Sequence, residues 1–391
     1  MERVVVGLSG GVDSSVAAYL LKKQGYEVIG VFMRNWHDDT VTKSNECPWI
    51  DDSNDALAVA EHLDIPYYVI DLSKEYKKRI VDYMFSEYEK GRTPNPDVLC
   101  NKEIKFDPYL KAALNLKADY VATGHYCRKM TDEKGIHHLL KGKDPSKDQS
   151  YFLCQLSQYQ LAKVIFPIGN LLKSEVREIA KEAGLATAEK KDSQGLCFVG
   201  KVSLPTFLQQ KLAPQKGDVI EIDEQLERIQ EYHQIPVEMT HVEALSKPFA
   251  FKREEGMKVA EHQGAHYYTV GQRKGLHIGG RPNPSFVLQI DTANNLVFSG
   301  QRGTHSGLNR YALKIRPEEV HYVNPDKKLS LGASYEMEVR IRYRQPLQKA
   351  TVIRKEKGVY ILFQKAQRGI TPGQFAAWYK GDELIGSGVI A

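Results

Sequence analysis

The first two hundred residues alternate between apolar runs and amphipathic stretches. The apolar runs predict strands over 4–7, 27–33, 66–72 and 119–123. Between them, apolar positions at helical spacing predict helices over 13–24, 55–63 and 79–90. This alternation is typical of βαβ units, so we predict an α/β fold with a doubly wound parallel sheet. Ligands of such sheets bind beyond the carboxyl ends of the strands, so the loops after Gly7, Met33 and Thr123 should converge.

The remainder of the chain has a different pattern. A short strand is predicted over 216–223, and the polar stretch 224–255 that follows shows little periodicity. From residue 286 onward, short alternating runs separated by turn residues predict an antiparallel β-barrel or sandwich. We therefore predict an α/β domain over 1–200, a small central domain over 201–285 and a C-terminal β-barrel over 286–391.

Composition and charge narrow the class of protein. The chain is 42% apolar and carries a formal net charge of +5. Residues 331–391 hold ten Lys or Arg against five Asp or Glu. This basic end favours a polyanionic partner, although a solvated charged surface explains it equally well. No apolar run approaches the roughly 18 residues of a membrane helix, and the first residues enter a strand without a signal-peptide pattern. We expect a cytoplasmic protein with no membrane partner.

Residues 8–15 read LSGGVDSS and join the first predicted strand to the first predicted helix. The Ser-Gly-Gly turn can aim successive backbone N–H groups at an anion, at the N-terminus of a helix. Asp13 and Ser14 fall in the first helical turn, where they can cap amides or bind phosphate oxygens, and Asp13 can also hold Mg²⁺. The lysine and spacing of a Walker A motif are missing. The alternative interpretation is an ordinary capped turn.

This loop resembles the pyrophosphatase loop of the ATP pyrophosphatase superfamily. Members of that superfamily cleave ATP between the α and β phosphates and adenylate a carbonyl oxygen of their substrate. Because they do not transfer the γ phosphate, the resemblance explains the absent lysine. It leaves the acceptor open, because the superfamily includes GMP, NAD, asparagine and argininosuccinate synthetases as well as enzymes that modify tRNA.

Two of the five cysteines lie in polar, charged segments. Cys100 follows Asp97 within GRTPNPDVLCNKEIKF, residues 91–106, and Cys197 lies within KKDSQGLCFVG, residues 190–200. Neighbouring lysines favour the reactive thiolate at both positions. Inert, buried thiols are expected at Cys47, Cys127 and Cys154. No C-x-x-C pair occurs, so we predict neither a metal site nor a structural disulfide framework.

An adenylated carbonyl carbon is an electrophile from which AMP departs. Replacing its oxygen by sulfur requires a sulfur nucleophile, which a cysteine persulfide supplies. A second thiolate can then release the product by attacking the first cysteine and forming a disulfide. Cys100 and Cys197 suit this scheme, and their proximity is a prediction about the fold because 97 positions separate them.

Motifs from end to end of the chain resemble those of the bacterial tRNA-specific 2-thiouridylase family. They are LSGGVDSSVAAYLL, TPNPDVLCNKEIKF, VATGHY, KDQSYFLCQL, DSQGLCFVG, YYTVGQRKGL and IRYRQ. The resemblance implies an adenine nucleotide alpha hydrolase-like domain, a small central domain and a C-terminal barrel that contacts tRNA. It implies that ATP, together with Mg²⁺, adenylates the C2 carbonyl of the wobble uridine before persulfide sulfur replaces the oxygen. The implied partners are a tRNA anticodon loop and a persulfide sulfur donor or relay protein.

The resemblance also assigns roles to residues. The ATP-binding residues are Gly7, Leu8, Ser9, Gly10, Gly11, Val12, Asp13, Ser14, Met33 and Gly124. Cys197 is the implied persulfide carrier, and Cys100 is the implied thiol that resolves it and releases 2-thiouridine. Asp97 is a candidate general acid or base. The substrate-binding residues are Asn95, Pro96, Asp97, Lys147, Asp148, Gln149, Arg342 and Tyr343.

Several alternatives stay open. Residues 147–150 also suit a helix cap, and 272–274 a solvated turn. Arg340, Arg342 and Arg344 alternate and are expected on one strand face, which faces either solvent or phosphate. Some thirty extra residues near 226–258 depart from the family pattern, as a local elaboration or a partner-docking element. For the whole protein, the alternatives are a synthetase that adenylates a small molecule and an RNA-binding module that holds ATP as a structural ligand.

Overall fold

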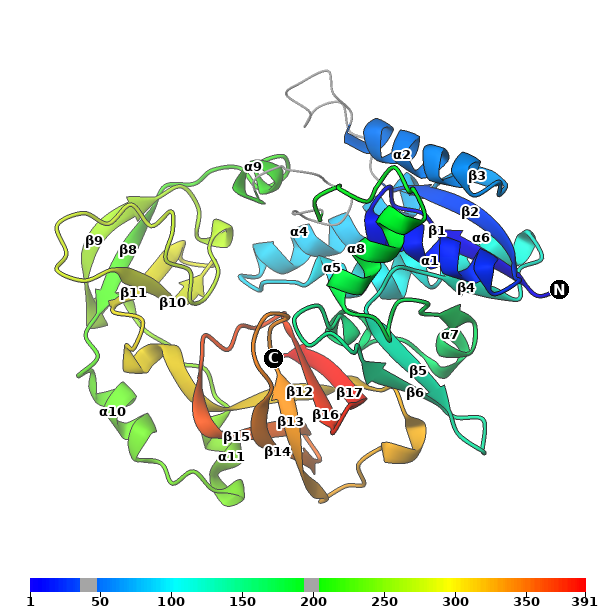
Figure 1. The fold of residues 1–391 in the computed structure, drawn as a ribbon. Coiled ribbons are helices and arrows are strands. Elements are labelled where there is room, and N and C mark those ends of the chain that lie inside the picture. The colour runs from blue at the N-terminus through cyan, green and yellow to red at the C-terminus, as the bar shows by residue number, and fades with distance from the viewer. Residues whose placement is uncertain (36–47, 193–203) are drawn as a thin grey trace.

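The computed structural model describes residues 1–35, 48–192 and 204–391, and it contains the predicted parallel sheet (Figure 1). Five strands pair in the order β3-β2-β1-β4-β7, and every pairing is parallel. Their bounds are Arg3–Gly7 (β1), Glu27–Arg34 (β2), Tyr67–Asp71 (β3), Tyr120–Ala122 (β4) and Val164–Ile165 (β7). The strand order reverses at β1, which pairs with β2 on one side and β4 on the other, so the loops after β1 and β4 meet at this switch point.

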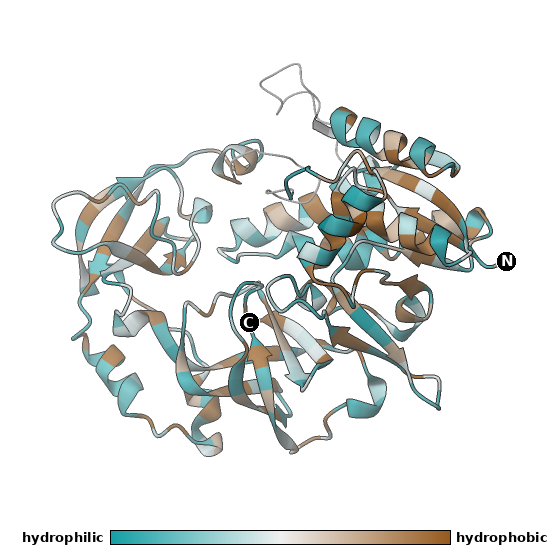
Figure 2. Ribbon diagram, in the orientation of Figure 1, coloured by the Kyte–Doolittle hydropathy of each residue, from teal (hydrophilic) through white to brown (hydrophobic). Residues whose placement is uncertain are grey.

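Helices cover both faces of this sheet. Val4 and Val6 of β1 point into one apolar cluster and Val5 into another, as the period of two in a strand requires. The cluster around Val4 and Val6 includes residues of α1 (Val12–Lys23), α2 (Pro48–His62) and α8 (Lys173–Glu182). The cluster around Val5 includes residues of α4 (Asp82–Glu89), α5 (Pro96–Cys100) and α6 (Pro108–Asn115). Figure 2 shows the hydrophobic residues along these strands, and the doubly wound prediction is confirmed.

The helix predicted over 79–90 is longer than expected. The structure has a continuous helical stretch made of α3 (Ser73–Tyr76), a π-helical turn (Lys77–Val81) and α4. The helix predicted over 55–63 likewise begins earlier, at Pro48. Both N-terminal extensions are rich in polar residues, so the apolar periodicity alone did not indicate them.

The central part of the chain forms a four-stranded sheet in the order β10-β11-β8-β9. Its strands are Gly217–Ile222 (β8), Gly256–His262 (β9), Ser285–Asp291 (β10) and Leu296–Gln301 (β11). In sequence, β10 and β11 lie within the range 286–391 that we assigned to the barrel, apart from Ser285, yet β11 pairs with the central strand β8, and β10 pairs with β11. The three domain limits stay a proposal.

The C-terminal strands form a closed antiparallel barrel of six strands in the order β12-β15-β14-β13-β16-β17, with β12 also paired to β17. They are Asn309–Tyr322 (β12), Ser334–Arg340 (β13), Gln348–Lys355 (β14), Gly358–Arg368 (β15), Phe375–Lys380 (β16) and Glu383–Ile390 (β17). A hairpin from the α/β domain extends this sheet, since β6 (His137–Lys141) pairs with β17 and with β5 (Cys127–Thr131). The predicted barrel is confirmed, and the hairpin of the first domain is joined to it at β17.

The extra residues near 226–258 form short helices that bridge the central sheet and the barrel (Figure 1). Ile229 of α10 (Glu227–Gln234) packs in the central apolar cluster, whereas Tyr232 packs with barrel residues. Leu245 of α11 (Val242–Leu245) joins the same barrel cluster. The Tyr232 hydroxyl donates to the Leu245 carbonyl at 2.9 Å and accepts from the Tyr311 amide at 2.8 Å. These contacts favour the local structural role over partner docking.

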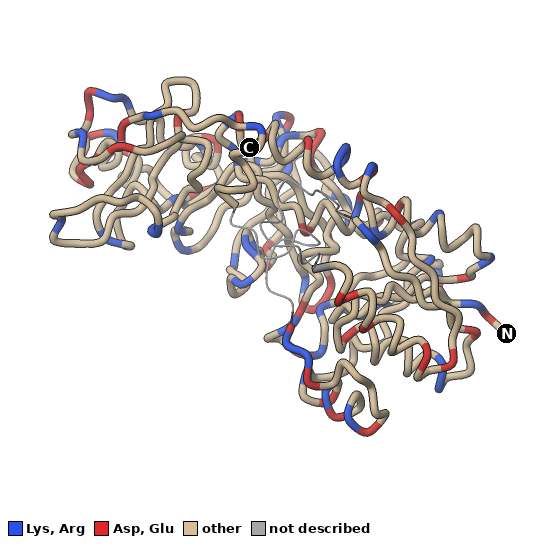
Figure 3. Tube along the Cα trace, turned by 90° about the horizontal axis from the view of Figure 1, so that it is seen from above, with Lys and Arg blue, Asp and Glu red and all other residues tan. Residues whose placement is uncertain are grey.

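Lys and Arg residues are interspersed with Asp and Glu residues along the chain trace instead of separating into two faces (Figure 3). Many of them are paired: Lys211, for example, contacts Asp82, and Lys355 contacts Glu243. Among the basic residues of 331–391, Arg340 and Lys355 take part in described ion pairs, with Asp148 and Glu243. Over the described part of the chain, no helix combines the length and the apolar character that crossing a bilayer would need.

We predict that Tyr232→Phe destabilises the protein by about 1–3 kcal/mol, because the change leaves the Leu245 carbonyl and the Tyr311 amide without their shared partner. Urea unfolding measures the loss. Tyr335→Phe is the matched control, since Tyr335 is 55% exposed and should shift stability by less than about 0.5 kcal/mol. Equal stability of the two variants would show that α10 is not held by this hydroxyl.

Candidate functional site

The loop after β1 presents backbone amides at the start of α1. Leu8 still pairs with β2 through its amide, which donates to Val31 at 2.9 Å, and Gly10 then takes a left-handed φ of +71°. A Cβ at Gly10 would lie 2.2 Å from the backbone oxygen of Asp52, so only glycine fits here. Gly11 occupies the N-cap position of α1 and supplies no side-chain cap. The first amides of α1 are therefore left to another acceptor.

Serine hydroxyls brace this loop from inside. Ser14 Oγ accepts from the Ser9 amide at 3.1 Å and donates to the Gly11 carbonyl at the same distance. Ser15 Oγ donates to the same carbonyl at 2.9 Å. Ser14 and Ser15 are buried, whereas Ser9 is exposed. The loop is thus held in shape before any ligand binds.

The other two predicted nucleotide loops lie beside the first. A Cβ at Gly124 would come within 2.7 Å of the Asp13 carbonyl carbon and the Ser14 nitrogen, so Gly124 abuts the start of α1. Met33 Cε lies 3.3 Å from the Cβ position of Gly7. The structure therefore brings together Gly7–Ser14, Met33 and Gly124, as the sheet topology predicted. Their contact with ATP stays a prediction.

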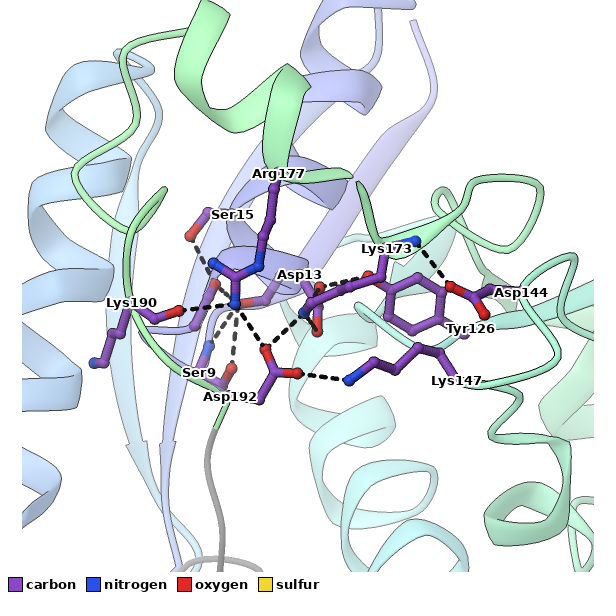
Figure 4. Close-up of polar contacts among 12 residues, drawn as sticks. Ser9, Asp13, Ser15, Tyr126, Asp144, Lys147, Lys173, Arg177, Lys190 and Asp192 are labelled. Atoms are coloured by element: carbon purple, nitrogen blue, oxygen red, sulfur yellow. Dashed lines mark hydrogen bonds and ion pairs between the residues drawn. The ribbon is translucent and has the colours of Figure 1, made fainter. Parts of the chain in front are cut away.

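Lys173 at the start of α8 points at this loop (Figure 4). Its Nζ lies 2.7 Å and 2.9 Å from the two carboxylate oxygens of Asp13, 2.8 Å from Asp192 Oδ1 and 5.7 Å from the centre of the Tyr126 ring. Its side chain is only 12% exposed. Tyr126 donates its hydroxyl to Asp13 at 2.7 Å, and burial, followed by the Asp13 charge, raises the pKa of that hydroxyl. A nearly buried ammonium thus lies beside the anion-binding loop.

Asp192 contacts two further cations beside Lys173, namely Lys147 and Arg177 (Figure 4). Lys147 Nζ lies 2.8 Å from Asp192 Oδ2, and Arg177 lies 3.2 Å from Oδ1. Although burial opposes ionisation, the bonds from Lys147 and Lys173 lower the pKa of Asp192 to about 2. Lys190 pairs with Asp52 and Asp55 of α2 nearby. An anionic ligand at the loop would meet four cations that now pair with carboxylates, namely Lys147, Lys173, Arg177 and Lys190.

The side chains that contact Asp13 decide whether it could hold the predicted Mg²⁺ ion. Both oxygens of Asp13 already bind the Lys173 ammonium, and one also accepts from Tyr126. A divalent cation on Asp13 would lie against that ammonium, so this arrangement of side chains does not fit a metal ligand. We derive no step through a metal ion.

Asn95 starts α5, the short helix that carries Cys100. Asn95 Oδ1 accepts from the Val98 amide at 3.1 Å, and Pro96 occupies the first helical turn, where no amide is needed. Asp97 is partly exposed, whereas Cys100 is fully buried in the core below the sheet. The predicted proximity of Asp97 and Cys100 on one helix is present.

The remaining cysteines divide into two groups. Cys47 and Cys197 lie outside the described residues, so the pairing of Cys197 with Cys100 stays a prediction. Cys127 and Cys154 are fully buried, and desolvation raises the pKa of both thiols, to about 12 for Cys154. These two thiols resist ionisation, as expected of inert core cysteines. The described chain that leads to Cys197 ends at Asp192, in contact with Lys173.

Residues 147–149, the predicted tRNA-contacting segment, make hydrogen bonds and ion pairs to other residues of the protein. Asp148 is buried, accepts from the Gly142 and Ser150 amides, and pairs with Arg340 of β13 at 3.3 Å. Gln149 Oε1 accepts from the Tyr126 amide at 3.0 Å. Lys147 reaches the Asp192 cluster instead. In this conformation the segment ties the nucleotide loop region to the barrel.

Arg342 and Tyr343 lie just past the end of β13. The expectation that Arg340, Arg342 and Arg344 share one strand face is wrong, because β13 ends at Arg340 and the chain then turns. Arg340 is buried, whereas Arg342 and Arg344 are exposed. Arg342 donates to the carbonyls of Val270 and Gly369 and to the Thr371 hydroxyl, and Tyr343 packs on Phe152 with ring centres 4.2 Å apart. Contact of Arg342 and Tyr343 with tRNA stays a prediction.

Sequence reasoning missed the cluster around Asp13. Lys173 and Arg177 lie on one helix, one turn apart, and a charged helix face is usually solvated. Tyr126 follows the strand-end motif, and Asp192 belongs to the motif that contains Cys197. Their nearness to one another depends on α8 packing against α1, which local sequence does not show.

Comparison with known proteins gives a consistent result. Three family models match: "tRNA methyl transferase HUP domain" over 2–201, "tRNA methyl transferase PRC-barrel domain" over 246–301 and "Aminomethyltransferase beta-barrel domain" over 313–390. The tRNA-specific 2-thiouridylase MnmA of Christiangramia forsetii is 58% identical over 100% of both chains, and that of Flavobacterium johnsoniae is 59% identical over 100% of both. The enzyme of the same name from Karelsulcia muelleri is 47% identical over 100% of this chain and 99% of its own.

We predict that Lys173→Met weakens ATP binding by about 10- to 100-fold, the usual value of a hydrogen bond to a charged group. Equilibrium binding of ATP measures the effect. Lys143→Met is the control, because Lys143 is 48% exposed and pairs only with Glu175 among its described salt bridges. An unchanged dissociation constant in Lys173→Met would show that this ammonium does not meet the phosphates.

The lowered pKa of Asp192 predicts a pH-dependent contribution to stability. The carboxylate stabilises the fold above its unfolded pKa near 3.8, and that contribution is lost as the pH falls toward about 2. Asp192→Asn should therefore be less stable than wild type at pH 7, and the difference should narrow between pH 4 and pH 2.5. Urea midpoints of the two proteins across this range test it. A difference that stays constant with pH would contradict the ion pairing.

Proposed function

The chain belongs to the tRNA-specific 2-thiouridylase family, and from this premise we propose that it replaces the C2 oxygen of a tRNA wobble uridine with sulfur. The observation that carries the proposal is the 58–59% identity to enzymes of that name over the whole length of both chains, barrel included. A synthetase for a small molecule would not need the C-terminal barrel that these relatives share. We place the reaction in the cytoplasm, where tRNA is modified.

The first step activates the uridine. The C2 carbonyl oxygen attacks the α-phosphorus of ATP, the bond to the β-phosphate breaks, and pyrophosphate leaves. The first amides of α1, left without a side-chain cap, suit the phosphates of ATP, and Lys173 supplies the positive charge that a Walker lysine supplies elsewhere. Met33 and Gly124 lie at the adjacent strand ends, where the adenosine would bind.

The second step transfers sulfur. The terminal sulfur of a Cys197 persulfide attacks the activated C2 carbon, and AMP leaves with the C2 oxygen. The Cys100 thiolate then attacks the Cys197 sulfur, the sulfur–sulfur bond breaks, and 2-thiouridine is released beside a Cys100–Cys197 disulfide. An external thiol must reduce that disulfide, and a persulfide donor or relay protein must recharge Cys197.

The base must reach this chemistry from the tRNA anticodon loop. A wobble base is unpaired in its loop, so turning it into a protein site is comparatively inexpensive. Asn95, Pro96 and Asp97 begin the helix that ends at Cys100, so they suit contact with the base, with Asp97 moving or stabilising a proton. The tRNA backbone would lie along Lys147, Asp148, Gln149, Arg342 and Tyr343, with Asp148 acting through its neighbours because its carboxylate is buried.

We predict that Cys197→Ser and Cys100→Ser each abolish 2-thiouridine formation while ATP- and tRNA-dependent pyrophosphate release persists. Nucleoside mass spectrometry and a pyrophosphate assay measure the two outcomes. The variants should differ in one respect: Cys100→Ser keeps the first sulfur transfer, so tRNA should accumulate in a thiol-sensitive covalent adduct with the protein. Cys197→Ser should form no adduct.

Cys154→Ala is the matched control, because Cys154 is a core thiol whose pKa burial raises to about 12, and it should retain thiolation. Full activity in both Cys100→Ser and Cys197→Ser would rule out the relay. Loss of pyrophosphate release in wild type with tRNA would instead support a protein that only binds RNA and ATP.

A further inference from the structure

A loop of the barrel contacts the α/β domain just before α5, the helix that carries Cys100. The loop between β15 and β16, residues 369–374, lies against residues 93–95, almost three hundred positions earlier in the chain. We propose that Gln374 is a positioning residue: it holds the helix that carries Asp97 and Cys100 in place from the barrel. The proposal rests on the proposed function for its catalytic meaning and on the contacts below for its geometry.

Gln374 makes three hydrogen bonds to the segment that precedes α5. Its Nε2 donates to the Thr93 carbonyl at 3.0 Å and to the Pro94 carbonyl at 3.2 Å. Its Oε1 accepts from Asn95 Nδ2 at 3.2 Å. Asn95 uses its other side-chain atom, Oδ1, to cap α5 through the Val98 amide. One side-chain amide therefore fixes both the backbone before the helix and the residue that starts it.

The backbone of the same loop approaches just as closely. The Thr93 amide donates to the Pro372 carbonyl at 2.9 Å. A Cβ at Gly373 would lie 2.9 Å from three backbone atoms of Thr93, and φ at Gly373 is +92°, so glycine is required on both counts. The loop and the segment fit together without room for a side chain.

The barrel holds this loop rigidly. The Gly373 amide donates to the Ile390 carbonyl at 2.9 Å, and the Ile390 amide donates to the Gln374 carbonyl at 2.8 Å. On its other side, Arg342 donates to the Thr371 hydroxyl at 3.0 Å and to the Gly369 carbonyl at 2.9 Å. Gln374 therefore acts from a fixed support.

The helix it holds needs such support. The five residues of α5 and the five of the π-helical turn that continues it, Asn101–Lys105, are too few to form a stable helix by themselves, because isolated helices shorter than about 12 residues are marginal in water. Tertiary contacts must therefore determine where Asp97 and Cys100 lie. Some of these contacts come from the barrel. The barrel therefore influences where the residues proposed for sulfur transfer lie.

The experiment compares thiol protection in the reduced protein without tRNA. Gln374→Met keeps the length of the side chain and removes all three hydrogen bonds. Because a buried thiol reacts through local opening, its alkylation rate reports how often α5 detaches. Peptide mapping after iodoacetamide should show Cys100 labelled roughly tenfold faster than in wild type, as expected from loss of hydrogen bonds worth about a factor of ten in total. The rates of the buried thiols Cys127 and Cys154 should stay unchanged.

Thiolation supplies the second readout. Single-turnover formation of 2-thiouridine should fall about tenfold in Gln374→Met, while the dissociation constant for tRNA stays within about twofold of wild type. Gln374→Glu should be slower still, because a carboxylate faces the Thr93 and Pro94 carbonyls. Gln155→Met is the matched control: Gln155 also joins the α/β domain to the barrel, through Ser387 at 2.7 Å, but does not touch α5. It should leave the Cys100 labelling rate unchanged.

Three results would overturn the proposal. The first is an unchanged Cys100 labelling rate in Gln374→Met, and the second is an equal rise at Cys100, Cys127 and Cys154, which would indicate general destabilisation. The third is failure of both Gln374 variants to fold, which would make the residue a general structural one. If wild type makes no 2-thiouridine, the proposed function fails, but the labelling result still decides whether Gln374 positions α5.

Discussion

The parallel pairing of β1 with both β2 and β4 is the constraint on which the site depends. Because β1 lies at the reversal of strand order, the loop that leaves it meets the loop after β4. The contact is close enough that Gly124 abuts the first turn of α1. Gly124 permits this approach, and Gly10 permits the close packing of the loop on Asp52 of α2, so the motif is a consequence of the packing around the sheet as much as of phosphate chemistry.

Charge compensation around Asp13 follows from the same geometry. Uncapped amides at the start of α1 attract anions, and in this structure the cations nearby are held by carboxylates of the protein. Lys173 is supplied by α8, 160 positions after Asp13, because α8 packs on α1. A loop without a lysine of its own can therefore gain one from a distant helix.

The sequence predicted what local patterns control. Apolar runs identified the strands of the parallel sheet, and the alternating runs after residue 286 identified the barrel class. Helix α2 began earlier than predicted because residues 51–55 read DDSND, a polar run that hides helical periodicity. The stretch over 224–255 looked irregular because its helices are short and bury only a few apolar residues each.

Long-range partners could not be predicted in this way. Asp148 was expected to face tRNA, yet it pairs with Arg340, which lies on a strand 192 positions away. Lys173, Tyr126 and Gln374 carried no local signal, because a lysine in a charged helix or a glutamine in a Pro-Gly turn is ordinary. Each of these residues acquires its role from a neighbour, and only the packing of separate elements brings that neighbour close.

The barrel is an integral part of the catalytic half of the molecule. The β5–β6 hairpin extends its sheet, Asp148 enters it to meet Arg340, and its loop at 371–374 holds the segment before α5. Each of these three contacts begins from a different predicted site segment of the α/β domain: the chain after Gly124, the segment 147–149 and the TPNP turn. A barrel attached only to bind tRNA would need none of them. Their convergence implies that the position of the barrel and the arrangement of the predicted site segments are coupled, because a shift of the barrel would move all three segments.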